Sequence, residues 1–308
     1  MSTFKKIVIG VVALIIVIPL VAFGYFYFKL NSMYDADSAK EINKKIEKVD
    51  EKNGITNILL VGVDGSNLEK GNRSDSMMIL TIDKNNNDIR LTSLARDTYV
   101  DIPGYGEQKL THAYAYGGPA LLLETINKNF DVKIDKYAAV SFDSFPKIID
   151  TIGGVEIDVL PKEVSYIPGV DHAGKQILDG DEALAYSRIR YADDAYHRDE
   201  RQRTVLEAAY SKLMTDFSSN FIDIGEELLS YTKTNIPPME IMNLAKDVIA
   251  INNADFAQME FPLEGHRDGK VLSKEKGYVI LWDKEYNKEQ LHKFIYDYKN
   301  YKPENNQS

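Results

Sequence analysis

The chain has 308 residues, of which 44% are hydrophobic and 27% charged, and its net charge is −10. It is long enough to bury a sizeable core in one large domain or two modest ones. The negative charge excludes wholesale binding to nucleic acid, so an anion site requires a local concentration of cations. The absence of cysteine excludes disulfides, thiolate nucleophiles and cysteine-based zinc sites.

The first feature along the chain is an uncharged, apolar stretch from Ile7 to Phe28. Its 22 residues are enough for a helix that crosses a hydrocarbon core of about 30 Å. A signal peptide is the alternative, but its apolar region is shorter and ends in small residues. Because Lys5 and Lys6 precede the stretch, we expect a cytoplasmic tail at 1–6 and a single-pass signal anchor in the cell membrane at 7–28. The remainder of the chain would then be extracellular.

Residues 29–53 are polar and charged, with apolar side chains at three- and four-residue spacing at Ala39, Ile42, Ile46 and Val49. This spacing predicts an amphipathic helix, which we interpret as a stalk or linker. We expect one catalytic domain at 54–302, followed by a flexible tail at 303–308.

Strand-like and helix-like segments alternate through this predicted domain, which indicates a layered α/β fold. The polar run 85–88 predicts a hairpin turn between the second and third strands. The expected strands are Asn57–Val63, Met77–Ile82, Ile89–Leu94, Tyr137–Ser141 and Val155–Val159. The expected helices are Pro119–Asn129, Ser144–Ile152, Arg198–Thr215, Pro238–Ile251 and Asp283–Tyr298.

Arginines are concentrated in one short window of the sequence. Five of the nine lie within 16 residues, at positions 188, 190, 198, 201 and 203. Arg188 and Arg190 would share one face of an extended segment, and Arg198 and Gln202 one face of a helix. Because guanidinium groups bind phosphate bidentately, converging pairs of this kind favour a pyrophosphate site. The alternative is a solvated basic face balanced by neighbouring acidic residues.

Two carboxylates lie at neighbouring strand ends. Asp64 follows the first predicted strand, and Asp75 precedes the second. Such a pair can hold one magnesium ion, which is commonly bound by one or two carboxylates together with substrate phosphates. The alternative is that both residues are structural turn or capping residues.

A third polar pair, Arg96 and Asp97, follows the third predicted strand. Asp97 can form a structural ion pair with Arg96, or it can take the proton of an attacking hydroxyl group in a phosphate pocket. The five histidines have no metal-ligand spacing and are interpreted as ordinary residues. Tyr114 and Tyr116 are interpreted as core residues, with a substrate groove as the alternative.

Taken in order, these segments resemble the LytR-CpsA-Psr family of Gram-positive cell-envelope proteins. The matching motifs are NILLVGVD (57–64), RSDSMM (73–78), SLARDT (93–98), KLTHAY (109–114), IGGVEIDV (152–159), LDGDEALAYSRIRY (178–191) and RDERQR (198–203). The resemblance implies a three-layer α/β/α domain with a mixed central sheet and an apolar pocket for a polyprenyl tail.

The resemblance also implies roles for individual residues. The implied magnesium ligands, with Mn²⁺ able to replace Mg²⁺, are Asp64 and Asp75, and the implied catalytic residues are Arg96 and Asp97. The implied pyrophosphate-binding residues are Arg73, Arg96, Lys109, Arg188, Arg190, Arg198 and Gln202. The matching helix could place either Arg201 or Arg198 inward. The segment 192–197 departs from the family pattern.

The implied activity is a phosphotransferase that moves an anionic glycopolymer, such as wall teichoic acid or capsule, from a polyprenyl pyrophosphate to peptidoglycan. The implied partners are this lipid-linked donor, the peptidoglycan acceptor and the membrane. A non-catalytic carrier-binding protein and a pyrophosphate hydrolase remain alternatives. A transcriptional regulator is disfavoured because six cytoplasmic residues cannot hold a DNA-reading module.

Overall fold

The computed structural model describes residues 27–49, 54–65, 68–189, 195–216, 231–251 and 256–302, with only the backbone described at 195–199, 210, 213–216 and 256. The predicted tails at 1–6 and 303–308 lie outside these residues. So does the predicted anchor at 7–28, apart from its last two residues, which belong to a helix that is described over 27–33. Among the described helices, none has the length and apolar character needed to cross a membrane.

A six-stranded mixed sheet forms the centre of the domain, in the order β10-β3-β2-β1-β6-β9. Four strands run parallel to one another, and β2 and β9 run the opposite way. The predicted mixed sheet is thus confirmed. The strands are β1 (Ile55–Val63), β2 (Ser74–Asp83), β3 (Asp88–Leu94), β6 (Lys136–Ser141), β9 (Thr232–Thr234) and β10 (Phe256–Phe261). We call the edge where β1, β3, β6 and β10 end the carboxyl edge.

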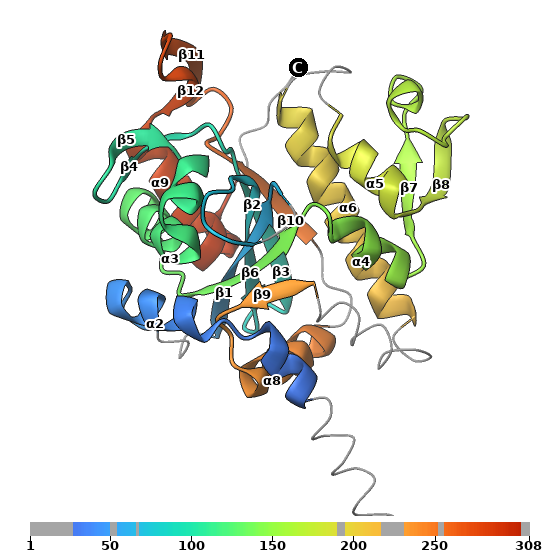
Figure 1. Ribbon diagram of the computed structural model, residues 1–308, viewed down its shortest axis with the longest axis horizontal. Coiled ribbons are helices and arrows are strands. Elements are labelled where there is room, and N and C mark those ends of the chain that lie inside the picture. The colour runs from blue at the N-terminus through green and yellow to red at the C-terminus, as the bar shows by residue number, and fades with distance from the viewer. Residues whose placement is uncertain are drawn as a thin grey trace, which may run out of the picture.

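Both faces of this sheet are apolar, because side chains that alternate along each strand are buried on both sides. Helices α3 (Thr111–Phe130) and α9 (Lys284–Tyr296) cover one face, where Leu59 and Ile79 lie in the largest hydrophobic core. Helices α6 (Ala195–Asp216) and α8 (Pro238–Ala250) lie on the other side of the sheet (Figure 1). The domain therefore has the three α/β/α layers that the family resemblance implied.

The second face carries two separate hydrophobic clusters rather than one continuous core. At the end of the sheet away from the carboxyl edge, Ile58 and Ile82 pack with Leu244 of α8. Nearer the carboxyl edge, α6 packs with its own cluster from α4 (Phe145–Thr151), β7 (Val155–Val159), β8 (Gly174–Leu178) and α5 (Gly180–Ser187). We call these four elements together with α6 the side unit, which lies to the right in Figure 1.

Two further hairpins stand beside the carboxyl edge, where the sequence predicted no strands. They are β4–β5 (Tyr99–Ile102 and Gly106–Lys109) and β11–β12 (Arg267–Ser273 and Gly277–Trp282). Ile280 donates a backbone hydrogen bond to the carbonyl of Asp97, which joins the second hairpin to the segment after β3. Helix α3 also starts eight residues earlier than predicted and is kinked at Gly117 and Gly118.

Helix α2 (Ala36–Lys45) lies within the region that we expected to be a spacer, and it packs on the domain. Ile42 is fully buried in the main core, and Ala39 is 5% exposed. Asp35 caps the helix and accepts a hydrogen bond from the hydroxyl of Tyr137 on β6. Because both contacts reach into the domain, α2 belongs to its helical layer and does not act as a free linker.

Replacement of Ile42 by alanine tests this docking. We expect Ile42→Ala to lower the free energy of unfolding by about 2–5 kcal/mol, because it removes buried apolar atoms and leaves a cavity. Urea denaturation of the full chain measures the change. The neighbouring exposed substitution Asn43→Ala should change stability by less than about 0.5 kcal/mol. Equal effects of the two changes would show that α2 is not part of the folded unit.

Candidate active site at the carboxyl edge of the sheet

A β-bulge positions Asp75 at the start of β2. Gly62 of β1 pairs with Ser76, and the next residue, Val63, pairs with Ser74, so Asp75 has no partner on β1. A bulge of this kind bends the strand and redirects the extra side chain. Asp75 therefore lies at the carboxyl edge beside the end of β1, only 14% exposed.

Arg96 and Lys109 join Asp75 and Asp97 in a compact network of opposite charges. Nη1 of Arg96 lies 2.7 Å from Oδ1 of Asp75, and its Nε lies 3.5 Å from Oδ2 of Asp97. Nζ of Lys109 lies 3.0 Å from Oδ1 of Asp97. Burial by itself lowers the pKa of Arg96, but the two carboxylates outweigh it, so the net pKa is raised and the guanidinium stays charged.

The start of α3 fixes this network in place. The backbone N–H of Thr111 donates to the carbonyl of Arg96 at 3.0 Å, and its hydroxyl donates to the carbonyl of Ser74 at 2.8 Å. One residue thus ties together the end of β3, the start of β2 and the first turn of α3. Because one carbonyl belongs to Arg96 and the other to the residue before Asp75, the backbone of both charged residues is tied to α3.

His112 is a member of this site that our interpretation of the histidines missed. Its pKa is lowered from 6.5 by burial and then by the charges of Arg73 and Lys109, while Asp97 opposes the shift. Its Nδ1 is buried and has no hydrogen-bond partner among the described residues. The one signal for it in the sequence is its place in the KLTHAY motif, since histidine spacing carries no information here.

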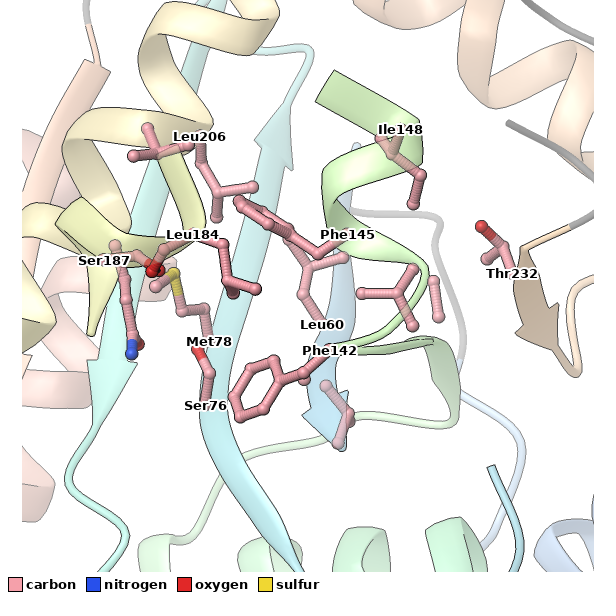
Figure 2. A pocket seen from close by; sticks show the side chains of 16 residues that line it. Leu60, Ser76, Met78, Phe142, Phe145, Ile148, Leu184, Ser187, Leu206 and Thr232 are labelled. Carbon is pink, nitrogen blue, oxygen red and sulfur yellow. The ribbon is translucent and has the colours of Figure 1, made fainter. Parts of the chain in front are cut away.

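An apolar cavity of about 320 Å³ lies between the sheet and the side unit. Figure 2 shows Leu60 and Met78 on the strands, with Phe145, Leu184 and Leu206 on the helices that surround them. The cavity occupies the gap between the two hydrophobic clusters on this face of the sheet. Its lining comprises Leu60, Val61, Gly62, Ser76, Met78, Ala138, Val140, Phe142, Phe145, Ile148, Leu184, Ser187, Gln202, Val205, Leu206 and Thr232.

One end of the cavity meets the charged network. Ser76 lines the cavity and follows Asp75 directly, so the lining begins next to the Arg96 ion pair. The guanidinium carbon of Arg188 lies 4.7 Å from the ring centroid of Phe142, which also lines the cavity. An apolar space that opens beside cations suits a ligand with an apolar tail and an anionic head.

The other predicted site residues are placed as follows. Asp64 and Arg73 are exposed at the carboxyl edge, where the N–H of Asp64 donates to the carbonyl of Arg73 at 2.9 Å. Gln202 lines the cavity. Arg190, residues 192–194 and the side chains of 195–198 lie outside the described part of the chain.

Arg201 has a structural role within the side unit. Its Nε donates to Oε1 of Glu163 at 2.7 Å, and both side chains are almost completely buried. Of the two arginines considered for the inward position, Arg201 therefore points into the side unit, toward Glu163. Removal of one partner from a buried pair of this kind is strongly destabilising, because it leaves the other charge buried and uncompensated.

The donor set fits a hard cation held partly by a substrate. Asp64 directly follows β1, and Asp75 lies in the bulge at the start of β2. Oδ1 of Asp75 is buried and makes no aligned hydrogen bond to a described residue, although the Arg96 cation lies beside it. In the described ranges no group of three or more carboxylate or histidine side chains could hold a metal. Magnesium nevertheless commonly uses one or two carboxylates and completes its coordination with phosphates and water.

The sequence matches a family model, and the fold matches solved structures. The model of the LytR_cpsA_psr family matches residues 22–292. The chain therefore belongs to the LytR-CpsA-Psr family, and the resemblance of its motifs is confirmed. It is 33% identical over 264 residues to the polyisoprenyl-teichoic acid–peptidoglycan teichoic acid transferase TagU of Enterococcus faecalis, covering 80% of this chain and 84% of that protein.

Two solved structures share the fold. TagT bound to LIIa-WTA superposes with a TM-score of 0.68 at 26% identity, covering 82% of this chain and 94% of that chain. TagV of B. subtilis superposes with a TM-score of 0.65 at 27% identity, covering 82% of this chain and all of that one.

The lowered pKa of His112 is directly measurable. By NMR titration of the full chain in detergent micelles we expect a value below 6.5, rising when Lys109→Met removes one of the nearby cations. Between the folded pKa and 6.5 the unfolded chain binds more protons at this site. The free energy of unfolding that His112 contributes is therefore complete above pH 6.5 and is lost as the pH falls through this window.

The matched control is Lys128→Met, a change on α3, the helix that carries His112. Lys128 forms an ion pair with Asp101 at 2.6 Å and is half exposed, so its removal should leave the His112 pKa unchanged. A His112 pKa at or above 6.5, or an equal response to both lysine changes, would place His112 outside the charged network.

Proposed function

We propose that this chain is a magnesium-dependent, membrane-anchored phosphotransferase. Its donor is an anionic glycopolymer linked to a polyprenyl pyrophosphate, and its acceptor is a hydroxyl group of peptidoglycan. The observation that carries the proposal is the apolar cavity that ends at the Arg96 network. The activity of the Enterococcus TagU relative, at 33% identity, supports the same donor and acceptor.

In this proposal the prenyl tail lies in the cavity and the pyrophosphate lies at its mouth. Arg96, Lys109 and Arg188 bind the phosphate oxygens, together with Arg73, Arg190, Arg198 and Gln202. Arginine and lysine at these positions hold the donor in register and offset the charge that develops on its oxygens. The apolar lining excludes water from the tail, and burial of each CH₂ group stabilises the complex by about 0.8 kcal/mol.

The transfer step exchanges one phosphorus–oxygen bond for another. The acceptor hydroxyl oxygen bonds to the phosphorus that carries the polymer, and the bond from that phosphorus to the bridging anhydride oxygen breaks. Polyprenyl phosphate leaves with the bridging oxygen, and Asp97 takes the hydroxyl proton. Bound by Asp64 and Asp75, magnesium or manganese would neutralise charge on the pyrophosphate. The anhydride itself supplies the free energy.

The anchor at 7–28 holds the domain at the membrane that contains the donor. Because Lys5 and Lys6 precede the anchor, and Lys29 after it is followed by Asp35 and Asp37, residues 1–6 stay in the cytoplasm and the domain lies outside. A reporter that is active only in the cytoplasm, fused to the N-terminus, should give a signal in intact cells. A signal from the same reporter at the C-terminus would contradict this topology.

A transfer assay tests the function. The full chain in detergent micelles is given a synthetic polyprenyl-pyrophosphate saccharide and peptidoglycan glycan strands. We expect covalent attachment to the glycan that requires magnesium, and Arg96→Ala should lower kcat by roughly a hundredfold because it removes a preorganised cation. Asp75→Asn should raise the magnesium concentration needed for half-maximal rate.

The matched control is Lys128→Ala, which removes a cation from α3 on an exposed surface and should leave the rate unchanged. Release of free saccharide phosphate without attachment, across several acceptors, would identify a hydrolase. Donor binding with neither reaction would identify a carrier-binding protein. Full turnover by Arg96→Ala would contradict the assignment of the site itself.

A further inference from the structure

Two exposed tyrosines stack on each other beside the charged network. The ring centroids of Tyr105 and Tyr116 are 4.5 Å apart with an interplanar angle of 22°. Tyr105 is 51% exposed and Tyr116 is 38% exposed, so each ring keeps an outer face in contact with solvent. Tyr114, by contrast, is 1% exposed, and its hydroxyl donates to the carbonyl of Leu68. Of Tyr114 and Tyr116, therefore, only Tyr116 is exposed to a ligand.

The backbone presents both rings from constrained positions. Tyr105 lies in the turn of β4–β5 between Gly104 and Gly106, which have φ of 81° and 69°. Tyr116 ends the first segment of α3, directly before the kink at Gly117 and Gly118. The left-handed φ of 63° at Gly118 is rarely adopted by residues with a side chain. Folding thus fixes two large apolar rings at the surface instead of in the core.

His112 connects this tyrosine pair to the reaction site. Its ring centroid lies 5.7 Å from that of Tyr116, one helical turn further along α3. Arg73, Lys109 and Asp97 all influence the pKa of the same imidazole, so His112 lies close to the charged network as well as to Tyr116. A ligand that lies on the rings can therefore reach the network with an adjoining group.

The tyrosine pair and the cavity lie on opposite sides of the sheet. Tyr116 belongs to α3, which packs on the face with Leu59 and Ile79, whereas the cavity uses the face with Leu60 and Met78. In phosphoryl transfer the attacking and leaving oxygens are roughly in line through the phosphorus. Because the leaving group is joined to the tail in the cavity, the attacking hydroxyl must arrive from the far side. That is the side on which the tyrosines lie.

We propose that Tyr105 and Tyr116 form the binding platform for the acceptor glycan, a chain of β-1,4-linked N-acetylated amino sugars. The proposal rests on the proposed transferase function and adds the acceptor subsite to it. The outer faces of the rings pack against the C–H faces of sugar rings, which are uncharged and suit exposed aromatic surface. A sugar bound there directs a neighbouring hydroxyl past His112 to the phosphorus.

Acceptor kinetics of the full chain in detergent micelles test the platform. Tyr105→Ala and Tyr116→Ala should each raise the KM for glycan strands by roughly five- to tenfold. The KM for the donor and the kcat at saturating acceptor should stay unchanged. Tyr116→Phe keeps the ring and should restore the acceptor KM. Binding of a short β-1,4-linked N-acetylglucosamine oligosaccharide, followed by NMR, should weaken in parallel in the alanine variants.

Tyr166→Ala is the matched control, since Tyr166 is 39% exposed but ends the short 3-10 helix Val164–Tyr166, which lies between β7 and β8 in the chain. It should leave every constant unchanged. An unaltered acceptor KM in the Tyr105→Ala, Tyr116→Ala double variant would overturn the platform while leaving the transferase intact. If the wild-type chain transfers to no acceptor but binds the oligosaccharide through the two tyrosines, the transferase proposal fails and the glycan site stands.

Discussion

The contact between Arg96 and Asp75 is the interaction on which the site depends. It joins the end of β3 to the bulge at the start of β2, across 2.7 Å, at the point where the apolar cavity begins. Asp97 and Lys109 extend it toward the β4–β5 hairpin, and Thr111 locks it to α3. A half-buried network of this kind is worth more than an exposed ion pair because water screens it less.

The division of one sheet face between two hydrophobic clusters explains why a cavity exists at all. A single helical layer would close over Leu60 and Met78 as it does over Leu59 and Ile79 on the other face. Here α8 covers one end of the face, and part of the apolar surface of the side unit packs within its own core instead of on the sheet. The gap between the two clusters is therefore apolar, and one end of its lining lies next to the charged edge.

Much of the fold could be predicted from the sequence, because apolar runs such as Asn57–Val63 and the helix at Pro238 carry strong local patterns. The β11–β12 hairpin could not, since β11 is almost entirely exposed and has no apolar alternation. The candidate site residues Asp75 and Arg96 were predicted from their places at strand ends and from family motifs. The bulge at Asp75, the burial of Arg201 with Glu163 and the place of His112 depend on long-range pairing that local patterns do not encode.

Isothermal titration of prenyl pyrophosphates of increasing chain length tests whether one ligand occupies both the cavity and the charged network. We expect the affinity for the full chain to rise with each isoprene unit until the cavity is full. Ala138→Phe, which fills the cavity, should abolish that increment, whereas Arg96→Gln should weaken every ligand by the same factor. Affinity that is independent of chain length, or an increment that survives Ala138→Phe, would show that the prenyl tail does not bind in the cavity.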